Sequence, residues 1–180
     1  LVKTTTKLPN NVIIAQTDIE NGLKTFYGGR CHFSFVKTSI EKSYELNGTF
    51  VDSLRTEQEY DDYGNVIKRV TDYGGGFKDS LINTFHNNTP NWILGRLRYS
   101  RLYRKAIGKS TIVRASAFDY DTTTNTGLLI NEIIEPDSGN TIRIKKSYQY
   151  DVFGNIIQSS KSAWNGSAVE TRTTTSVMDS

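Results

Sequence analysis

Side chains that could support covalent catalysis are few in this chain. His32 and His86 are its two histidines, and neither accompanies a serine in the Gly-x-Ser-x-Gly turn of a nucleophile elbow. Cys31 directly precedes His32, and neighbouring side chains of a strand point to opposite faces, so these two cannot form a catalytic pair. We expect Cys31 to be a small buried side chain. The sequence therefore predicts no enzymatic activity.

Oxygen ligands for a metal ion occur together in one segment. Four residues alternate as the first ligands of a calcium loop do: Asp119, Asp121, Thr123 and Asn125. Thr124 stands where such a loop needs glycine, and Ile130 stands where it needs a bidentate glutamate. A hairpin loop explains the segment better, and we expect no metal and no other cofactor.

A basic stretch offers binding chemistry, because no acidic residue lies between Asp79 and Asp119. Its cationic residues are interleaved with Tyr99 and Tyr103, and they are Arg96, Arg98, Arg101, Arg104, Lys105, Lys109 and Arg114. Aromatic rings in a basic groove are how single-stranded nucleic acid is held. A hairpin with one cationic solvent face, which also protects a sheet edge, explains the same residues and is preferred. The alternative is a binding module for an anionic glycan, protein or nucleic acid, with Arg96, Arg98, Arg101 and Arg104 on its face.

The elements that position these residues are indicated by a repeated motif, Tyr-Asp-x-x-Gly-Asn, at residues 60–65 and 150–155. The aspartate is expected to accept hydrogen bonds from backbone amides two residues on. The glycine supplies the positive φ of a type I turn closed by a G1 bulge, and the tyrosine covers one sheet face. A looser copy spans residues 118–127. The predicted turn residues are Tyr60, Asp61, Gly64, Asn65, Asp121, Gly127, Tyr150, Asp151, Gly154 and Asn155.

Composition agrees with a fold made of hairpins. Ten tyrosines, abundant threonine and serine, three prolines and 36% hydrophobic residues suit half-buried sheet surfaces better than helices or one deep core. We predict an all-β fold of repeated antiparallel hairpins in an extended, curved sheet. Residues 27–162 form the repeat region, residues 1–26 a polar arm or edge strand, and residues 163–180 a polar tail or unpaired strand. No apolar run is long enough to span a bilayer, so no membrane insertion is expected.

Three segments allow specific expectations. The glycine-rich residues 73–77 are interpreted as a flexible loop or turn, and residues 79–86 fit either a helical turn or a strand. The apolar run Trp92-Ile93-Leu94 follows a turn and is expected to be a buried anchor.

The chain resembles the Rhs/YD-repeat family, and in particular the repeat region of SpvB-like and toxin-complex B-component bacterial proteins. The two Tyr-Asp-x-x-Gly-Asn copies carry this resemblance together with Asn-Trp-Ile-Leu-Gly-Arg-Leu at 91–97, Phe-Asp-Tyr-Asp at 118–121 and Thr-Gly-Leu-Leu at 126–129. These motifs lie between residues 57 and 158, which is most of the chain. The aspartate-bearing segment by which members of the family cleave themselves has no match in this sequence.

The resemblance implies a structural role. Members of this family build long β-ribbons that spiral into a hollow shell around a C-terminal toxic domain. The expected function is therefore that of a scaffold module in a secreted or cell-surface protein. Its expected partners are further repeats of the same chain and an enclosed toxin domain, and open sheet edges predict self-association.

Overall fold

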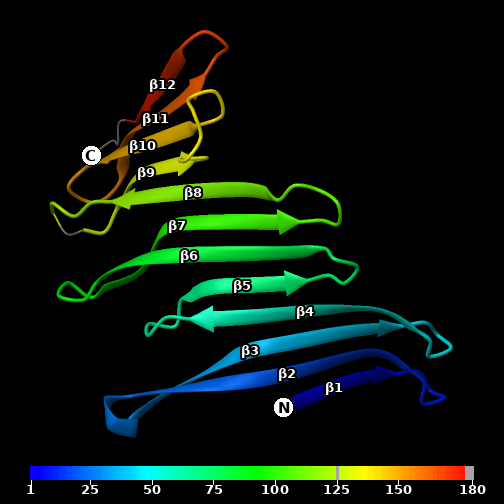
Figure 1. Cartoon of the computed structure of the whole chain (residues 1–180). Helices are drawn as coiled ribbons and strands as arrows, with labels where there is room; N and C mark the ends of the chain where they lie inside the picture. The colour runs from blue at the N-terminus through cyan, green and yellow to red at the C-terminus, as the bar shows by residue number, and fades with distance from the viewer. Residues whose placement is uncertain (125, 177–180) are drawn as a thin grey trace. The chain divides into compact units, whose positions relative to one another are not determined.

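Antiparallel strands make up nearly all of the chain, which a computed structural model describes at residues 1–124 and 126–176. Twelve strands follow one another in sequence order in one sheet, each hydrogen-bonded to its neighbours in the chain (Figure 1). Apart from strands and turns, the described residues contain one short 3-10 turn, Tyr27–Gly29. The predicted all-β fold of repeated antiparallel hairpins is confirmed.

The strands are joined by turns of a few residues. The first six are β1 (Val2–Lys7), β2 (Ile13–Phe26), β3 (Cys31–Tyr44), β4 (Phe50–Tyr60), β5 (Val66–Asp72) and β6 (Lys78–Asn88). The second six are β7 (Ile93–Lys105), β8 (Ile112–Tyr120), β9 (Leu129–Ile134), β10 (Ile144–Tyr150), β11 (Ile156–Trp164) and β12 (Val169–Thr175).

The described residues divide into two compact units. The first contains residues 1–82 and 102–113, and the second contains residues 83–101 and those from 114 onward. The first unit thus holds β1 to β5, and the second holds β9 to β12.

Both ends of the described chain are more regular than the sequence predicted. Residues 1–26 contain the edge strand β1 and also β2, which pairs with β1 and with β3. The expectation of a polar tail or unpaired strand beyond residue 163 is wrong for 169–175, because β12 pairs with β11 from Val169 to Thr175. Its β-branched threonines favour extended backbone whether or not they are buried. Residues 177–180 lie outside the described part of the chain.

A bulge recurs beside several of the turns. In β4–β5 the pairing passes from Glu59↔Lys68 to Tyr60↔Val66, which leaves Ile67 as an extra residue. The same step leaves Ile157 extra in β10–β11 and Ile130 extra in β8–β9. A β-bulge bends its strand and increases the local twist, so these hairpins share one local geometry.

The sheet has little core of its own. Among the described residues, Ala115, Gln16, Thr38 and Gly127 are the buried ones, and no side chain is fully enclosed. Large apolar side chains such as Phe50, Phe77 and Ile112 remain exposed. Stabilisation therefore comes from strand pairing and from contacts between neighbours on each face.

Aromatic rings supply the closest of these contacts in the first unit. Phe35 lies 4.9 Å from Tyr60 and 5.5 Å from Phe33, measured between ring centroids. Phe35 pairs across the sheet with Gly22. A Cβ on Gly22 would lie 2.4 Å from the Phe35 ring, so the missing side chain lets the ring lie over the neighbouring strand.

Two sequence expectations about burial are wrong. Trp92 is 76% exposed, with a φ of +53° in the turn between β6 and β7, because a single layer offers no interior behind its turns. Cys31 is exposed at the start of β3. The two ambiguous segments are also resolved: residues 79–86 belong to strand β6, and residues 73–77 form a hydrogen-bonded turn.

Candidate functional site

The two Tyr-Asp-x-x-Gly-Asn turns have the same hydrogen bonds. Oδ1 of Asp61 accepts from the amides of Tyr63 and Asn65, each at 2.9 Å. Oδ1 of Asp151 accepts from the amides of Phe153 and Asn155, again at 2.9 Å. The aspartate therefore holds the turn by the side-chain-to-amide bonding that Asx turns use.

The backbone closes each turn in the geometry of a type I turn with a G1 bulge. In the second copy the Asp151 amide donates to the Asn155 carbonyl at 3.0 Å, and the Gly154 amide donates to the Asp151 carbonyl at 3.1 Å. Gly154 has a φ of +87°, and Gly64 has +84° in the first copy. These angles lie in the left-handed region, where glycine has no steric penalty.

The asparagine of the motif has a role that sequence reasoning missed. Its side-chain amide donates to the second carboxylate oxygen, from Asn65 to Asp61 at 2.8 Å and from Asn155 to Asp151 at 2.9 Å. The recurrence of asparagine directly after the glycine was the available signal. These bonds from Asn155, followed by those from the backbone amides, lower the pKa of the Asp151 carboxyl. The carboxylate is thus held ionised and fully engaged within its turn.

The looser third copy is a wider loop around Asp121. Its carboxylate accepts from the amides of Thr123 at 2.9 Å and Thr124 at 3.2 Å, and from the hydroxyls of Thr124 and Thr126. These bonds, from Thr124 first, hold the pKa of Asp121 far below its usual range. Asn125, a ligand of the calcium loop considered above, lies outside the described residues.

Gly127 completes this loop under a steric constraint. It has a φ of +67°, and a Cβ there would lie 2.8 Å from Cγ2 of Ile93. Ile93 belongs to the Asn-Trp-Ile-Leu-Gly-Arg-Leu block, so the structure brings that block against the third copy. Both lie in the second unit.

The tyrosine before each aspartate contacts the strand that precedes its own. Tyr120 in β8 donates its hydroxyl to the Leu97 carbonyl of β7 at 3.0 Å, and Tyr150 in β10 donates to the Leu129 carbonyl of β9 at 2.7 Å. Burial raises the pKa of both phenols. Tyr60 reaches its preceding strand through its ring instead, against Phe33 and Phe35 of β3.

Most arginines of the basic stretch are engaged with carboxylates or rings. Arg104 forms a bidentate pair with Asp79, with nitrogen–oxygen distances of 3.0 and 2.8 Å. Arg101 and the hydroxyl of Tyr99 both bond to Asp137. Arg114 pairs with Glu135 at 3.4 Å. The neighbouring Arg104 guanidinium lowers the pKa of Asp79. These partners come from segments that the sequence separates widely.

The remaining two arginines lie near Tyr120. Arg96 places its guanidinium carbon 5.7 Å from the centre of the Tyr120 ring, a cation–π contact. Arg98 is exposed and lines a shallow hollow with His86, Asp119 and Thr122. Arg101 stacks instead on Tyr99, at 5.2 Å, and side chains of a strand alternate between faces. Arg98 and Arg101 therefore project from different faces of β7.

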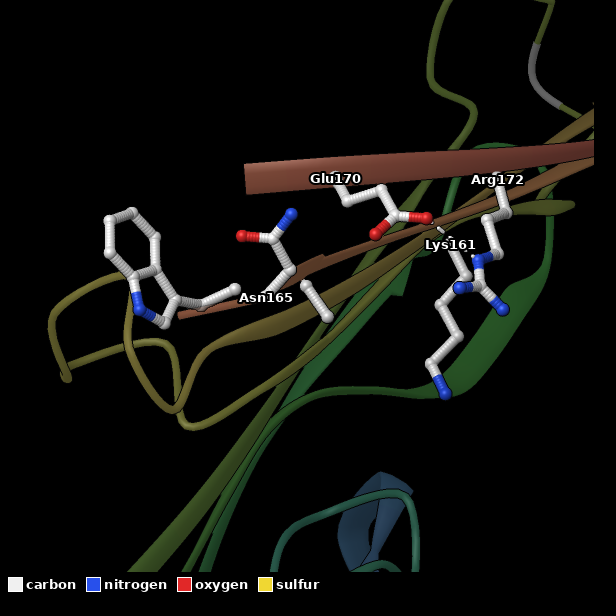
Figure 2. Close-up of a pocket in the computed structure, with 6 residues that line it drawn as sticks. Lys161, Asn165, Glu170 and Arg172 are labelled. Carbon is white, nitrogen blue, oxygen red and sulfur yellow. Dashed lines mark hydrogen bonds and ion pairs between the residues drawn. The ribbon is translucent and has the colours of Figure 1, made fainter. Parts of the chain in front are cut away.

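A pocket of about 310 Å³ lies on the β11–β12 hairpin, lined by Trp164 and Ala163 as well as by charged side chains. Figure 2 shows Glu170 and Arg172 joined by an ion pair, with the Lys161 ammonium pointing away from Glu170 and Asn165 nearer the turn. The pair distance is 2.9 Å, and Arg172 lowers the pKa of the Glu170 carboxyl. Lys161 and Arg172 are direct cross-strand partners, so Glu170 offsets a like-charge contact.

Groups of three or more metal-binding side chains are absent from the described residues. Of the helices in that part of the chain, none is long and apolar enough to cross a membrane. The chemistry present at the turns and on β7 is hydrogen bonding and charge pairing within the sheet.

Comparison with known proteins gives only distant structural likenesses. No model of a protein family matches the chain, and no curated protein matches it. Among solved structures, a porin-like protein from Bacteroides uniformis aligns over 95% of this chain and 88% of its own, with 13% identity and a TM-score of 0.28. A TM-score this low supports no inference about the fold or the function of this chain.

Proposed function

We propose that this chain is a structural YD-repeat module, one section of the β-sheet shell of a larger secreted or cell-surface bacterial protein of the toxin type. The observation that carries the proposal is a regular series of hairpins with almost no core of its own. Ala115 has the one buried hydrophobic side chain in the described part of the chain. A wall of sheet needs regular pairing more than it needs a deep interior.

The turn chemistry supports a structural role. The carboxylates of Asp151 and Asp121 are held ionised by bonds from their own turns. A general acid or base needs a pKa near the working pH and access to a substrate. The pKa of each of these two carboxyls is lowered, which suits a group that fixes its turn better than a general acid or base.

The tyrosines support growth of the sheet by addition of hairpins. Tyr120 and Tyr150 each donate to a carbonyl of the strand before their own. Each hairpin is thereby stabilised by the one it follows, as in other repeat proteins, whose stability is mainly a sum of neighbour terms. The partners proposed for this module are therefore further repeats of the same chain, and the outer edges of β1 and β12 are where they would pair.

Limited proteolysis of the full-length gene product tests the proposed enclosure of a C-terminal toxin domain. We expect the wild-type C-terminal domain to resist protease while the shell is intact. Gly64→Val with Gly154→Val should open the wall and speed its cleavage, whereas Gly139→Ala, at a glycine without positive φ, should not. Equal cleavage of all three proteins would contradict enclosure.

The alternative function is a binding module that uses the arginines of the basic stretch. Arg96, Arg98, Arg101 and Arg104 were expected on one face, but alternation along β7 places Arg101 on the opposite face from the other three. Because Arg101 and Arg104 pair with carboxylates and Arg96 lies over the Tyr120 ring, the exposed Arg98 is the guanidinium that such a module would use. Salt-dependent retention on heparin that Arg98→Gln abolishes would favour this alternative. Retention unchanged by Arg98→Gln would contradict this alternative.

A further inference from the structure

Two neighbouring turns of the first unit enclose a hollow that the scaffold role does not use. One turn is the glycine-rich link between β5 and β6, and the other is the link between β7 and β8. The hollow has a volume of about 530 Å³ and is lined by Gly74, Gly75, Gly76, Lys78, Asp72 and the residues from Lys105 to Lys109. Both turns lie in the same compact unit.

Ile107 holds the two turns together. A Cβ on Gly76 would lie 2.4 Å from Cγ1 of Ile107, so the isoleucine side chain occupies the space that any other residue at 76 would fill. Gly76 has a φ of +77°, which also favours glycine. The contact fixes the lysine-bearing turn beside the glycine-bearing turn.

The charge of the hollow is positive and partly unpaired. Lys78 is neutralised by Asp72 at 3.0 Å. Lys105 and Lys109 form no ion pair within residues 1–124 and 126–176, although Arg101, Arg104 and Arg114 of the same basic stretch each have a carboxylate partner. The two lysines therefore provide a net charge of about +2 in the lining of the hollow.

The backbone adds hydrogen-bond donors. Gly74, Gly75 and Gly76 all have positive φ, at +74°, +55° and +77°. The Gly74 amide donates to Asp72, and the Phe77 amide donates to the Gly74 carbonyl. Within the described chain the amides of Gly75 and Gly76 donate to no protein acceptor. Successive amides in a turn form concavities that bind anions.

From these features we infer that the hollow is an oxyanion site, which binds a sulfate or phosphate group through Lys105, Lys109 and the amides of Gly75 and Gly76. Lysine suits this chemistry because its ammonium acts as a compact point charge toward a tetrahedral oxyanion. The volume exceeds that of one such ion, so the site has room for the ester-linked part of a small ligand beside Ala106 and Ile107. The inference does not depend on the proposed scaffold function.

The test is titration of the isotope-labelled 180-residue chain with inorganic sulfate and, separately, inorganic phosphate, followed by amide chemical shifts. We expect saturable shifts at Gly75 and Gly76. Lys105→Gln with Lys109→Gln should weaken binding roughly tenfold or more, because each lost charged hydrogen bond is worth about a factor of ten. The matched control is Lys145→Gln with Lys161→Gln, which removes two other exposed lysines that form no ion pair in the described chain and should leave the affinity unchanged.

Two small ligands then distinguish the sources of the oxyanion. A sulfated disaccharide that binds more tightly than inorganic sulfate assigns the site to sulfated glycans, and a nucleoside monophosphate that binds more tightly than inorganic phosphate assigns it to phosphate esters. Absence of shifts at Gly75 and Gly76 with both ions would overturn the inference. Equal weakening by the two double variants would also overturn it, since binding would then follow net charge alone.

Discussion

The side-chain amide of Asn155 donates to Oδ2 of Asp151 at 2.9 Å, while the backbone amide of Asn155 donates to Oδ1 of the same carboxylate at 2.9 Å. One residue therefore engages both carboxylate oxygens. Asn65 makes the same two bonds to Asp61 in the other copy of the motif. This recurring arrangement gives a structural reason for aspartate and asparagine to occur together in the turn.

Removal of this side-chain bond should weaken the hairpin. Asn155→Ala is expected to lower the free energy of unfolding by about 1 kcal/mol, the usual net contribution of one hydrogen bond. Chemical denaturation measures the change. Asn140→Ala is the matched control, because Asn140 is an exposed turn residue without a hydrogen bond in the described chain. A loss no larger than that of the control would show that the Asn155 bond contributes nothing.

Gly154 tests the backbone requirement of the turn in isolation. The nearest side-chain atom to a Cβ there is 4.0 Å away, so Gly154→Ala adds strain from its φ of +87° without a clash. We expect a loss of about 1–2 kcal/mol in the free energy of unfolding. Gly139→Ala, which has open space and no positive φ, should cause no such loss. If the two variants have equal stability, the proposed turn geometry is wrong.

Gly22 tests a steric requirement instead. Gly22→Ala should destabilise the first unit by about 1–3 kcal/mol, because its Cβ would lie 2.4 Å from the Phe35 ring and overpacking costs that much. Phe35→Leu in the same chain should relieve most of this cost. A double-mutant cycle by thermal or chemical denaturation gives the coupling. Additive effects of the two substitutions would show that the contact is not the cause.

The phenol of Tyr150 should contribute through its bond to the Leu129 carbonyl at 2.7 Å. Tyr150→Phe keeps the ring and removes the donor, and we expect a loss of about 0.5–1.5 kcal/mol. Tyr148, two residues earlier on the same strand, has no hydroxyl bond in the described chain and serves as control. Equal stability of Tyr150→Phe and Tyr148→Phe would show that the Tyr150 hydroxyl does not stabilise the pairing of β9 with β10.

Acid should weaken the Asp151 turn. Bonds from Asn155 lower the folded-state pKa of Asp151, so this carboxyl stabilises the fold above its unfolded pKa of about 3.9. That contribution is lost as the pH falls through the lower folded-state pKa. The free energy of unfolding, measured across this range, should therefore decrease less steeply in Asp151→Asn than in the wild type. Identical slopes would show that the Asp151 carboxyl is not linked to folding.

The turns could be predicted from the sequence because their interactions are local. Asp151, Gly154 and Asn155 lie within five residues of one another, and their types specify the geometry wherever the hairpin lies. The same local reasoning favoured strands on either side. It failed for Trp92, because burial depends on what lies behind a residue, and a single-layer sheet has nothing there.

The ion pairs and the oxyanion hollow could not be predicted, because they depend on register. Arg101 and Asp137 are separated by 36 residues in the sequence. The lengths of the intervening strands and turns bring their side chains together. Gly76 and Ile107 are brought together in the same way by two adjacent turns. No pattern within either segment indicates the other.

The central claim is that this chain is one section of a continuous wall of β-sheet. An electron cryomicroscopy structure of the full-length gene product tests this claim most directly. We predict that further Tyr-Asp hairpins add strands to the outer edges of β1 and β12, and that the sheet continues around an enclosed domain. A full-length structure in which both edges remain unpaired and no further hairpins adjoin them would contradict the scaffold role.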